Sequence, residues 1–589
     1  MKSPSLFAWM MRLWHTLSPL HPRQWHGRFR NLLQRVVDRF FLQRILQRGV
    51  TAVPTWRRVV PDVPWLGVDC DVDLAARRFA FLSHAKTFTD RIDWCAEDCS
   101  YLWSFNLNYF EYLHSAGTDA IWVIEDWMEA NPAPVRPAWS PYVTSLRIIN
   151  WSKWLWSRKE PCPPTVALSI AHQANYLSTH LEQHLLANHL LENARALLFA
   201  AATLKVPAAH RWRSIAERIL ARQLEEQVLD DGLHFERSWM YHGLLLVAYL
   251  DLVQLGKAGH LNGPLTDQAK MLSTRMAEAL QRGYFSDDTY PLFKDAAHGI
   301  APVPSAVLDY GTRVLDHQPG QRKQIANIDG FYLFRSGRVE WMVEAGPLSP
   351  DYNPGHAHAD MLSFQLHLDA KPLIVDTATS TYDNGPDRHH ERSSRAHNKV
   401  TVDGQNDSDV WSSFRVGRRA RPKDVQWYVE GPLTVFKGSH DGYRSLRGKP
   451  SCRRIMLQWR DRLLIVLDHV SGGRHELESA LHLAPGVAVE SLAPDRMKVG
   501  DAHLVSLNGE PWQRHAVQHA PRFGMHLDNV RLSLVKSCTH GTDFGYMLYW
   551  DLAVTEVRHD SQGIHVALAE SPDEIIFNRG GNGRWQVIS

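Results

Sequence analysis

The densest cluster of chemically active side chains lies in the second half of the chain. It contains the run Gly355-His-Ala-His-Ala-Asp360, then Asp376, then Arg395-Ala-His397-Asn398. If the first run is a strand, His356 and His358 point to the same face and can share a ligand or divide two tasks. Two imidazoles with carboxylates and a later histidine suit Zn²⁺ or a similar divalent ion. The pattern therefore predicts a functional site.

Two arrangements of this cluster stay open from the residues alone. In the first, His358, Asp376 and His397 hold a structural metal ion beside a catalytic His356. In the second, His358, Asp360 and His397 form the His-x-Asp…His triad of a non-haem iron oxygenase. The second arrangement predicts dependence on Fe(II) and 2-oxoglutarate, and it gives no role to the polar residues of the helical half.

Further polar groups fall in the first half of the chain. In the run Ala187-Asn-His-Leu-Leu-Glu-Asn193, the spacing places Asn188, His189 and Glu192 on one side of a helix. The run Arg237-Ser-Trp-Met-Tyr241-His242 opens another apolar helix. Buried Asn and His often bond only each other, and a tyrosine at a helix entrance often only fills space. Both groups become catalytic candidates if they face His356.

A basic loop separates Asp376 from His397. Its sequence, Arg388-His-His-Glu-Arg-Ser-Ser-Arg395, suits carboxylate or sulfate binding, although a solvated charged loop has the same composition. The candidate substrate-binding residues are Glu192, Arg237, Arg388, Arg392 and Arg395.

The elements that must position these residues change type near residue 325. From about Pro61 to Leu315, apolar residues recur every three or four positions, which predicts helices. Beyond residue 325, short β-branched runs alternate with turn signals, which predicts packed antiparallel sheets. The expected strands include 331–334, 399–402, 462–470 and 564–568.

Length and composition exclude several classes of protein. With 589 residues, 44% of them hydrophobic and 22% charged, the chain predicts two or three globular domains. No apolar run reaches the roughly 18 residues of a membrane-spanning helix. Six scattered cysteines exclude a disulfide scaffold. Of the 22 tryptophans, 15 precede residue 330, and we expect most of them in the core rather than stacked on sugar rings.

Charge is unevenly distributed. Residues 1–60 carry 11 Lys and Arg against Asp38 alone, whereas the whole chain has a net charge of only +2. Such a segment suits anionic lipid or an acidic partner, or it forms Arg-rich helices packed on the main body. We expect peripheral contact with a membrane or an envelope complex and no nucleic acid. Residues 1–20 resemble a signal peptide poorly, because Arg12 interrupts the apolar stretch.

Taken together, these pieces resemble the heparinase II/III family of polysaccharide lyases. The resemblance runs through Trp94, the stretch 102–113, Asn188-His189, Met240-Tyr241-His242, His356-Ala-His358-Ala-Asp360 and Ala396-His397-Asn398. It implies a multi-domain α+β fold, in which an N-terminal incomplete (α/α) toroid precedes an antiparallel β-sandwich domain. We therefore expect a basic helical segment over 1–60, a toroid over 61–325 and a β-sandwich over 326–589.

The resemblance also implies a chemistry. A lyase of this family removes the C5 proton of a uronic acid and expels the 4-linked sugar. Asn188 and His189 would neutralise the carboxylate, while Tyr241 and His356 would serve as acid and base in an order that depends on the C5 epimer. Glu192 matches a position that supports the site.

The metal and the setting follow from the same resemblance. His358, Asp376 and His397 fit a structural divalent ion, most simply zinc, that braces the β-domain wall of the cleft. The family implies an acidic polysaccharide substrate, such as heparan sulfate, alginate or a bacterial exopolysaccharide, and a periplasmic or cell-envelope location.

Two neighbouring functions remain open at this stage. A C5-epimerase would use the same residues and return the proton instead of expelling the sugar. A non-catalytic glycan-binding or assembly protein of an envelope polysaccharide system would bind without turnover.

Overall fold

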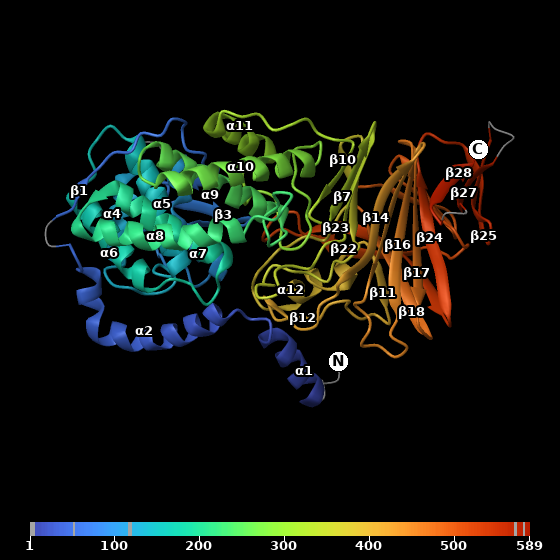
Figure 1. Ribbon diagram of the computed structural model, residues 1–589, viewed down its shortest axis with the longest axis horizontal. Coiled ribbons are helices and arrows are strands. Elements are labelled where there is room, and N and C mark those ends of the chain that lie inside the picture. The colour runs from blue at the N-terminus through green and yellow to red at the C-terminus, as the bar shows by residue number, and fades with distance from the viewer. Residues whose placement is uncertain (1–5, 51–52, 116–119, 570–573, 581–582, 589) are drawn as a thin grey trace.

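The computed structural model describes residues 6–50, 53–115, 120–569, 574–580 and 583–588. A helical body forms one end of the molecule and layered sheets form the other (Figure 1). Two N-terminal helices, α1 (Leu6–Leu17) and α2 (Pro22–Leu46), run along one edge of both parts. No helix in the described ranges has the length and apolar character to cross a membrane.

The helical body is an incomplete (α/α) toroid, as expected. Its helices are α3 (Tyr101–Tyr109), α4 (Ile121–Ala130), α5 (Pro141–Ser157), α6 (Pro164–Thr179), α7 (Ala187–Thr203), α8 (Pro207–Glu226), α9 (Trp239–Lys257), α10 (Gly263–Gly283) and α11 (Pro304–Leu315), with a short 3-10 helix, η1 (Glu111–His114). Proline lies in the first turn of α5, α6, α8, α10 and α11, where its missing N–H has no helical partner to lose. Several tryptophans are fully buried between the helices, among them Trp103, Trp127, Trp151, Trp212 and Trp239, which confirms their expected place in the core.

The region before α3 departs from the prediction of helix. It contains an antiparallel sheet of β2 (Asp71–Asp73), β3 (Arg78–Phe81) and β4 (His84–Thr87). On β3, Phe79 and Phe81 are buried and alternate with less buried residues, which is a strand pattern. Leu82 and Ser83 have positive φ and close the hairpin to β4. The prediction was wrong here because an alternating pair of aromatics is too short to stand out beside long helical repeats.

The second half consists of antiparallel sheets. Nearest the toroid lies a five-stranded sheet of β6 (Ile325–Ile328), β7 (Phe331–Ser336), β8 (Val339–Glu344), β9 (Phe364–Leu368) and β10 (Lys371–Ile374). A four-stranded sheet contains β11 (Val400–Val402), β18 (His475–His482), β23 (Leu527–Cys538) and β22 (Gln513–His519).

The largest sheet has eight strands in the order β14 (Pro422–Glu430), β15 (Leu433–His440), β16 (Ser451–Trp459), β17 (Leu463–Ser471), β24 (Gly541–Tyr549), β21 (Ala502–Ser506), β20 (Arg496–Val499) and β19 (Val489–Ala493). An outer sheet contains β25 (Val554–Asp560), β26 (Gly563–Leu568), β27 (Ile575–Arg579) and β28 (Trp585–Ile588). Two short pairs, β12 (Val410–Trp411) with β13 (Arg415–Val416) and β1 (Thr55–Trp56) with β5 (Leu204–Lys205), complete the strands. All four expected strands are confirmed.

The eight-stranded sheet is the middle layer of the β-domain, because both of its faces are buried. On β15, Phe436 packs toward the five-stranded sheet, and its neighbour Val435 packs toward the outer sheet. Side chains alternate across a strand, so apolar residues at successive positions serve two cores at once. This explains why 433–440 and 463–471 show little hydrophobic alternation in the sequence.

The N-terminal helices are anchored to both domains by polar contacts. Arg12 of α1 pairs bidentately with Asp409, at 2.9 and 2.7 Å, beside the β12–β13 hairpin. On α2, a Cβ at Gly27 would lie 2.6 Å from the backbone N of His184, so the helix touches the α6–α7 connection directly. Within the expected basic segment, α1 and α2 are helical and lie on the main body, whereas Thr55–Trp56 forms the strand β1 and residues 1–5 and 51–52 lie outside the described residues.

Candidate active site

A cavity of about 880 Å³ lies where the toroid, the β-domain and the N-terminal helices meet. Its lining includes Asn188, His189 and Tyr241 from the toroid and His356 from the β-domain. Residues that are far apart in the sequence therefore share one chamber, as the sequence analysis required. The aromatic residues in its wall are tyrosines and phenylalanines, and no described tryptophan lines it.

The first turn of α7 carries the polar residues of the toroid wall. Asn188 Nδ2 donates to Glu236 Oε1 at 2.9 Å, and His189 Nδ1 lies 3.1 Å from Glu182 Oε1. Burial opposes charge on His189, but the carboxylates of Glu182, Glu236 and Glu192 outweigh it and raise the pKa of this imidazole. About a third of the His189 side chain is exposed (34%), and its raised pKa favours the cationic form of this imidazole in the cavity wall.

Glu192 lies one turn further along α7 and also lines the cavity. Its Oε2 accepts a hydrogen bond from Arg195 Nε at 2.9 Å, and Arg195 in turn donates to Asp251 at 2.9 Å. Burial raises the pKa of Glu192, while the Arg195 cation opposes that rise. Glu192 thus belongs to a buried network of charged side chains, with Arg195 and Asp251, next to Asn188 and His189 on α7.

Tyr241 stands at the start of α9. Ser238 caps this helix by accepting a hydrogen bond from Tyr241 N, at 3.4 Å. The Tyr241 hydroxyl lies 3.0 Å from the hydroxyl of Tyr382, and its ring centroid lies 4.2 Å from that of His356. Burial, together with the hydroxyl of Tyr382, raises the pKa of Tyr241 well above its usual value. Tyr241 is therefore a neutral hydroxyl at physiological pH.

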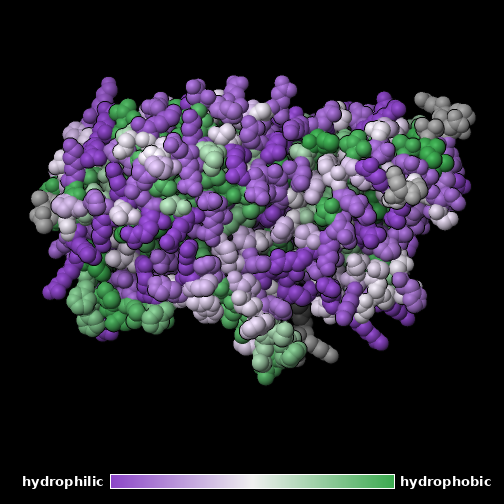
Figure 2. Space-filling view, viewed as in Figure 1, coloured by the Kyte–Doolittle hydropathy of each residue, from purple (hydrophilic) through white to green (hydrophobic). Residues whose placement is uncertain are grey.

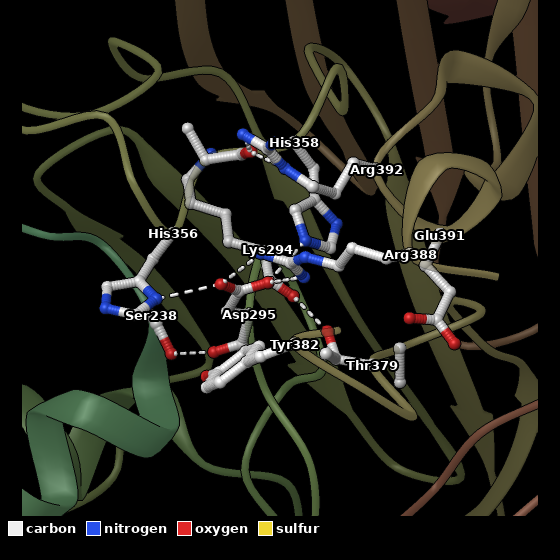
Figure 3. Close-up of polar contacts among 12 residues, drawn as sticks. Ser238, Lys294, Asp295, His356, His358, Thr379, Tyr382, Arg388, Glu391 and Arg392 are labelled. Atoms are coloured by element: carbon white, nitrogen blue, oxygen red, sulfur yellow. Dashed lines mark hydrogen bonds and ion pairs between the residues drawn. The ribbon is translucent and has the colours of Figure 1, made fainter. Parts of the chain in front are cut away.

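Asp295 is the residue that ties the two domains together (Figure 3). Its carboxylate accepts from His356 Nδ1 at 2.8 Å, lies 2.8 Å from His358 Nε2 and forms a bidentate pair with Arg388. Its backbone N donates to the carbonyl of His356 at 3.1 Å, and its carbonyl accepts from Ser238 Oγ at 2.7 Å. The Arg388 cation and these hydrogen bonds overcome burial and hold the pKa of Asp295 well below its usual range.

Sequence reasoning missed four residues of this site: Glu182, Glu236, Asp295 and Tyr382. Each lies in a loop or at an element end, and none belongs to a recognisable spacing. Lys294-Asp295 offered the one available signal, since it is a pair of charges between the apolar residues Phe293 and Ala296. Such a pair is buried only when it has partners.

The structure corrects the prediction that Arg237, Arg388 and Arg392 bind substrate. All three are buried, and none lines the cavity. Arg388 holds Asp295, Arg392 Nε donates to the carbonyl of Ala357 at 3.1 Å, and Arg237 donates to a backbone carbonyl. Arg395 is exposed on the 3-10 helix η2 (Ser394–Ala396) and also lies outside the cavity lining. The basic loop, with the short helix α12 (Pro386–Glu391), therefore orders the β-domain wall from within.

The predicted metal ligands lie close together, because the ring centroids of His358 and His397 are 5.4 Å apart and Asp376 contacts His397. Asp376 Oδ2 accepts from His397 Nδ1 at 2.8 Å, and His358 pairs with Asp295, so each histidine has a carboxylate behind it. His358 Nδ1 and His397 Nε2 have no hydrogen-bond partner among the described residues. Within those residues, however, no group of three or more His, Cys, Asp or Glu side chains is arranged to hold a metal ion. The zinc ion stays a prediction.

Asp360 has its own cation partner, Lys294. Both of its oxygens contact Lys294 Nζ, at 3.0 and 3.3 Å, in a fully buried ion pair. Because Asp360 neutralises Lys294, it is not free to complete a facial triad with His358 and His397, and the iron-oxygenase arrangement is wrong.

The fold and the site together define a class: toroid–sandwich proteins with a chamber between the two domains that holds asparagine, histidine and tyrosine. The chain belongs to the heparinase II/III family. The heparinase II/III N-terminus family matches residues 113–311, and the heparinase II/III-like C-terminal family matches residues 326–542.

Curated relatives carry the name heparin-sulfate lyase. One from Pedobacter heparinus is 25% identical over 60% of this chain and 56% of the relative, and one from Bacteroides thetaiotaomicron is 23% identical over 48% and 47%. The chain thus spans about half the length of these relatives. Among solved structures, heparan sulfate lyase HepC from Pedobacter heparinus has a TM-score of 0.57 at 17% identity, covering 93% of both chains. Heparinase III has a TM-score of 0.65 at 15% identity, covering 85% of both chains. These structures share the fold.

Proposed function

We propose that the protein is a polysaccharide lyase that cleaves a uronate-containing acidic polysaccharide by β-elimination. The observation that carries this proposal is the meeting of Tyr241 and His356, with ring centroids 4.2 Å apart, in the chamber that Asn188 and His189 also line. Lyase chemistry needs all of these groups on one sugar ring. The names of the curated relatives agree with this reaction class.

The carboxylate of the uronic acid would lie at the start of α7. The C5 proton is weakly acidic while that carboxylate keeps its full charge, so neutralising the charge lowers the barrier. His189 supplies a cation sustained by Glu182, and Asn188 supplies an amide oriented by Glu236. Both groups sit on the first turn of a helix, whose partial positive charge also favours an anion.

His356 and Tyr241 would then transfer the protons. In the elimination, the C5–H bond breaks, its electron pair forms the C4–C5 double bond, and the C4–O bond breaks toward the leaving sugar. Because the pKa of Tyr241 is raised, its neutral hydroxyl suits proton donation to the leaving oxygen. His356, oriented by Asp295 through Nδ1, would accept the C5 proton, and the C5 epimer decides whether these two roles are exchanged.

The test is a panel of acidic polysaccharides with ultraviolet detection of the new C=C bond and sizing of the products. Absorbance that rises as the chain shortens supports the lyase. Proton exchange at C5 without absorbance or shortening would indicate an epimerase instead. Binding without turnover on every substrate would indicate a non-catalytic glycan-binding protein.

The structural metal ion is tested separately by elemental analysis of the purified protein. Stoichiometric zinc that is lost on chelation, together with a lower melting temperature in His397→Ala, would support it. His356→Ala should leave melting nearly unchanged and abolish activity, because His356 acts on the sugar. Equal losses of melting temperature in the two variants would contradict this division.

A further inference from the structure

The two N-terminal helices turn their apolar sides away from the protein. Large apolar residues exposed on α1 and α2, which we call the docking face, are Leu6, Phe7, Trp9, Met10, Trp14, Trp25, Phe29, Leu32, Leu33, Val36, Phe40 and Phe41. The exposed fractions of Phe7, Phe29 and Phe40 are 73%, 62% and 69%. In Figure 2, the apolar side chains of both helices gather along one edge of the molecule. An apolar surface of this extent marks a binding site on a folded protein.

The side of α2 that contacts the protein is polar, whereas a surface helix usually packs its apolar side against the protein. Arg30 donates to the carbonyl of Thr179 at 2.8 Å, Asn31 lies 3.0 Å from His184 Nδ1, and Asp38 accepts from His180 at 2.7 Å. The apolar residues at 25, 29, 32, 36 and 40 follow the three- and four-residue spacing of a single helix face. An amphipathic helix that only covered its own protein would bury this face.

The positive charge of these helices indicates what kind of surface the docking face binds. Arg23, Arg35, Arg39 and Arg44 are exposed on α2, and no described carboxylate lies within ion-pair distance of them. The one acidic residue of α1 and α2, Asp38, is occupied by His180. A second copy of the chain would bring arginine against arginine across a two-fold axis. A surface that is both apolar and negatively charged is that of an anionic bilayer.

We propose that the docking face binds the protein to an anionic membrane surface, with α1 and α2 lying in the plane of the interface. Several charged residues on α2 prevent it from crossing the bilayer, so its apolar side chains would enter only the boundary between headgroups and acyl chains. The exposed tryptophans Trp9, Trp14 and Trp25 suit that boundary, and the arginines meet the lipid phosphates.

Docking would also place the cavity at the membrane. Thr16, Leu20, Gln24 and Arg28, from the ends of α1 and α2 and the link between them, form part of the cavity wall. The docking face and the cavity wall are therefore two sides of one segment. If the proposed lyase function holds, its substrate is an acidic polysaccharide that is attached to the membrane or lies on it.

The experiment is sedimentation of the full chain with vesicles, which does not depend on activity. Vesicles of phosphatidylcholine and phosphatidylglycerol in equal parts should bind the protein, and vesicles of phosphatidylcholine alone should bind it far less. High salt should weaken the binding. The variant Phe29→Glu/Val36→Glu/Phe40→Glu should lose about 1,000-fold in partitioning, since each of the three side chains accounts for roughly tenfold. Its melting temperature should match the wild type, because these side chains are exposed.

A matched control is Val303→Glu/Val429→Glu/Leu492→Glu, which changes three exposed apolar residues elsewhere, with exposed fractions of 53%, 48% and 49%, and should bind vesicles as the wild type does. Three outcomes overturn the proposal: no binding of the wild type to anionic vesicles, equal loss in both triple variants, or a dimer in solution that the α2 variant dissolves. Vesicle binding without cleavage of any polysaccharide would leave this proposal standing and remove the lyase function.

Discussion

Replacing Tyr241 by phenylalanine removes one oxygen atom from the cavity and changes little else in the fold. The hydroxyl has one hydrogen bond in the described part of the protein, 3.0 Å to Tyr382, and the ring keeps its contact with His356. Loss of a hydrogen bond of this kind costs about 1 kcal/mol of the free energy of unfolding. Against a total of about 5–15 kcal/mol, the variant should stay folded.

The effect on turnover should be much larger than the effect on stability. A positioned proton donor contributes about 100- to 10,000-fold, or roughly 3–5 kcal/mol of transition-state stabilisation. We therefore expect kcat of Tyr241→Phe to fall by at least about 100-fold, with a small change in KM, because the hydroxyl acts on the leaving oxygen rather than on substrate binding. The assay is the initial rate of ultraviolet absorbance on the polysaccharide that the panel identifies.

A matched control separates chemistry from folding. Tyr249 is buried in the same helix α9, and its hydroxyl donates to the carbonyl of Leu224 at 2.9 Å, outside the cavity. Tyr249→Phe should lose the same increment of stability and keep full activity. If Tyr241→Phe retained wild-type kcat, Tyr241 would have no part in proton transfer and the reasoning would be refuted.

Three other predictions use buried charges. Asp295→Asn should lower the melting temperature and cost about 3–5 kcal/mol, because Arg388 is left buried without its counter-charge, whereas Asp309→Asn in an exposed pair should cost less than about 1 kcal/mol; equal losses would contradict this. Because the pKa of His189 is raised, its cation is lost only as the pH rises above that pKa. Glu182→Gln removes a carboxylate that raises this pKa, so it should move the alkaline limb of the kcat/KM profile to lower pH. An alkaline limb that stays in place would exclude His189 as the cation. Burial lowers the pKa of His242 to about 4 and of His440 to about 3. Below about pH 6.5 the unfolded chain therefore binds more protons than the folded one, and the free energy of unfolding should fall by up to about 1.4 kcal/mol for each histidine with every pH unit of acidification. Thermal unfolding in acid that shows no such loss would refute this prediction.

Local patterns in the sequence predicted the two halves of the fold well. Helical spacing before residue 315 and β-branched runs after residue 325 reflect side-chain periods of the backbone itself, so they need no tertiary information. The small sheet β2–β4 escaped because its strands are only three or four residues long. The positions of Asn188, His189, Tyr241 and His356 in the cavity agree with the residues singled out from their types.

The basic loop shows where reasoning from residue types fails. Its arginines suit an anionic ligand, and in the fold the anion is Asp295 of the same chain. A guanidinium forms the same bidentate pair with a carboxylate of its own chain as with a substrate carboxylate. The sequence is therefore compatible with both a substrate-binding loop and an internally paired one. Only the path of the chain between α10 and α11, which brings Asp295 beneath the loop, decides between them.

The sequence by itself determined which segments are helices and strands, which side chains can do acid–base chemistry, and that the first 60 residues combine arginine with apolar residues. The tertiary structure decided which of those groups meet. In the tertiary structure, His356 contacts Tyr241, Asp295 of the toroid bonds His356 of the β-domain, and the apolar side of α2 faces outward. The physical reason is that hydrophobic periodicity defines a face of a helix but not what covers it, and carboxylate–cation pairing depends on distances that only long-range packing sets.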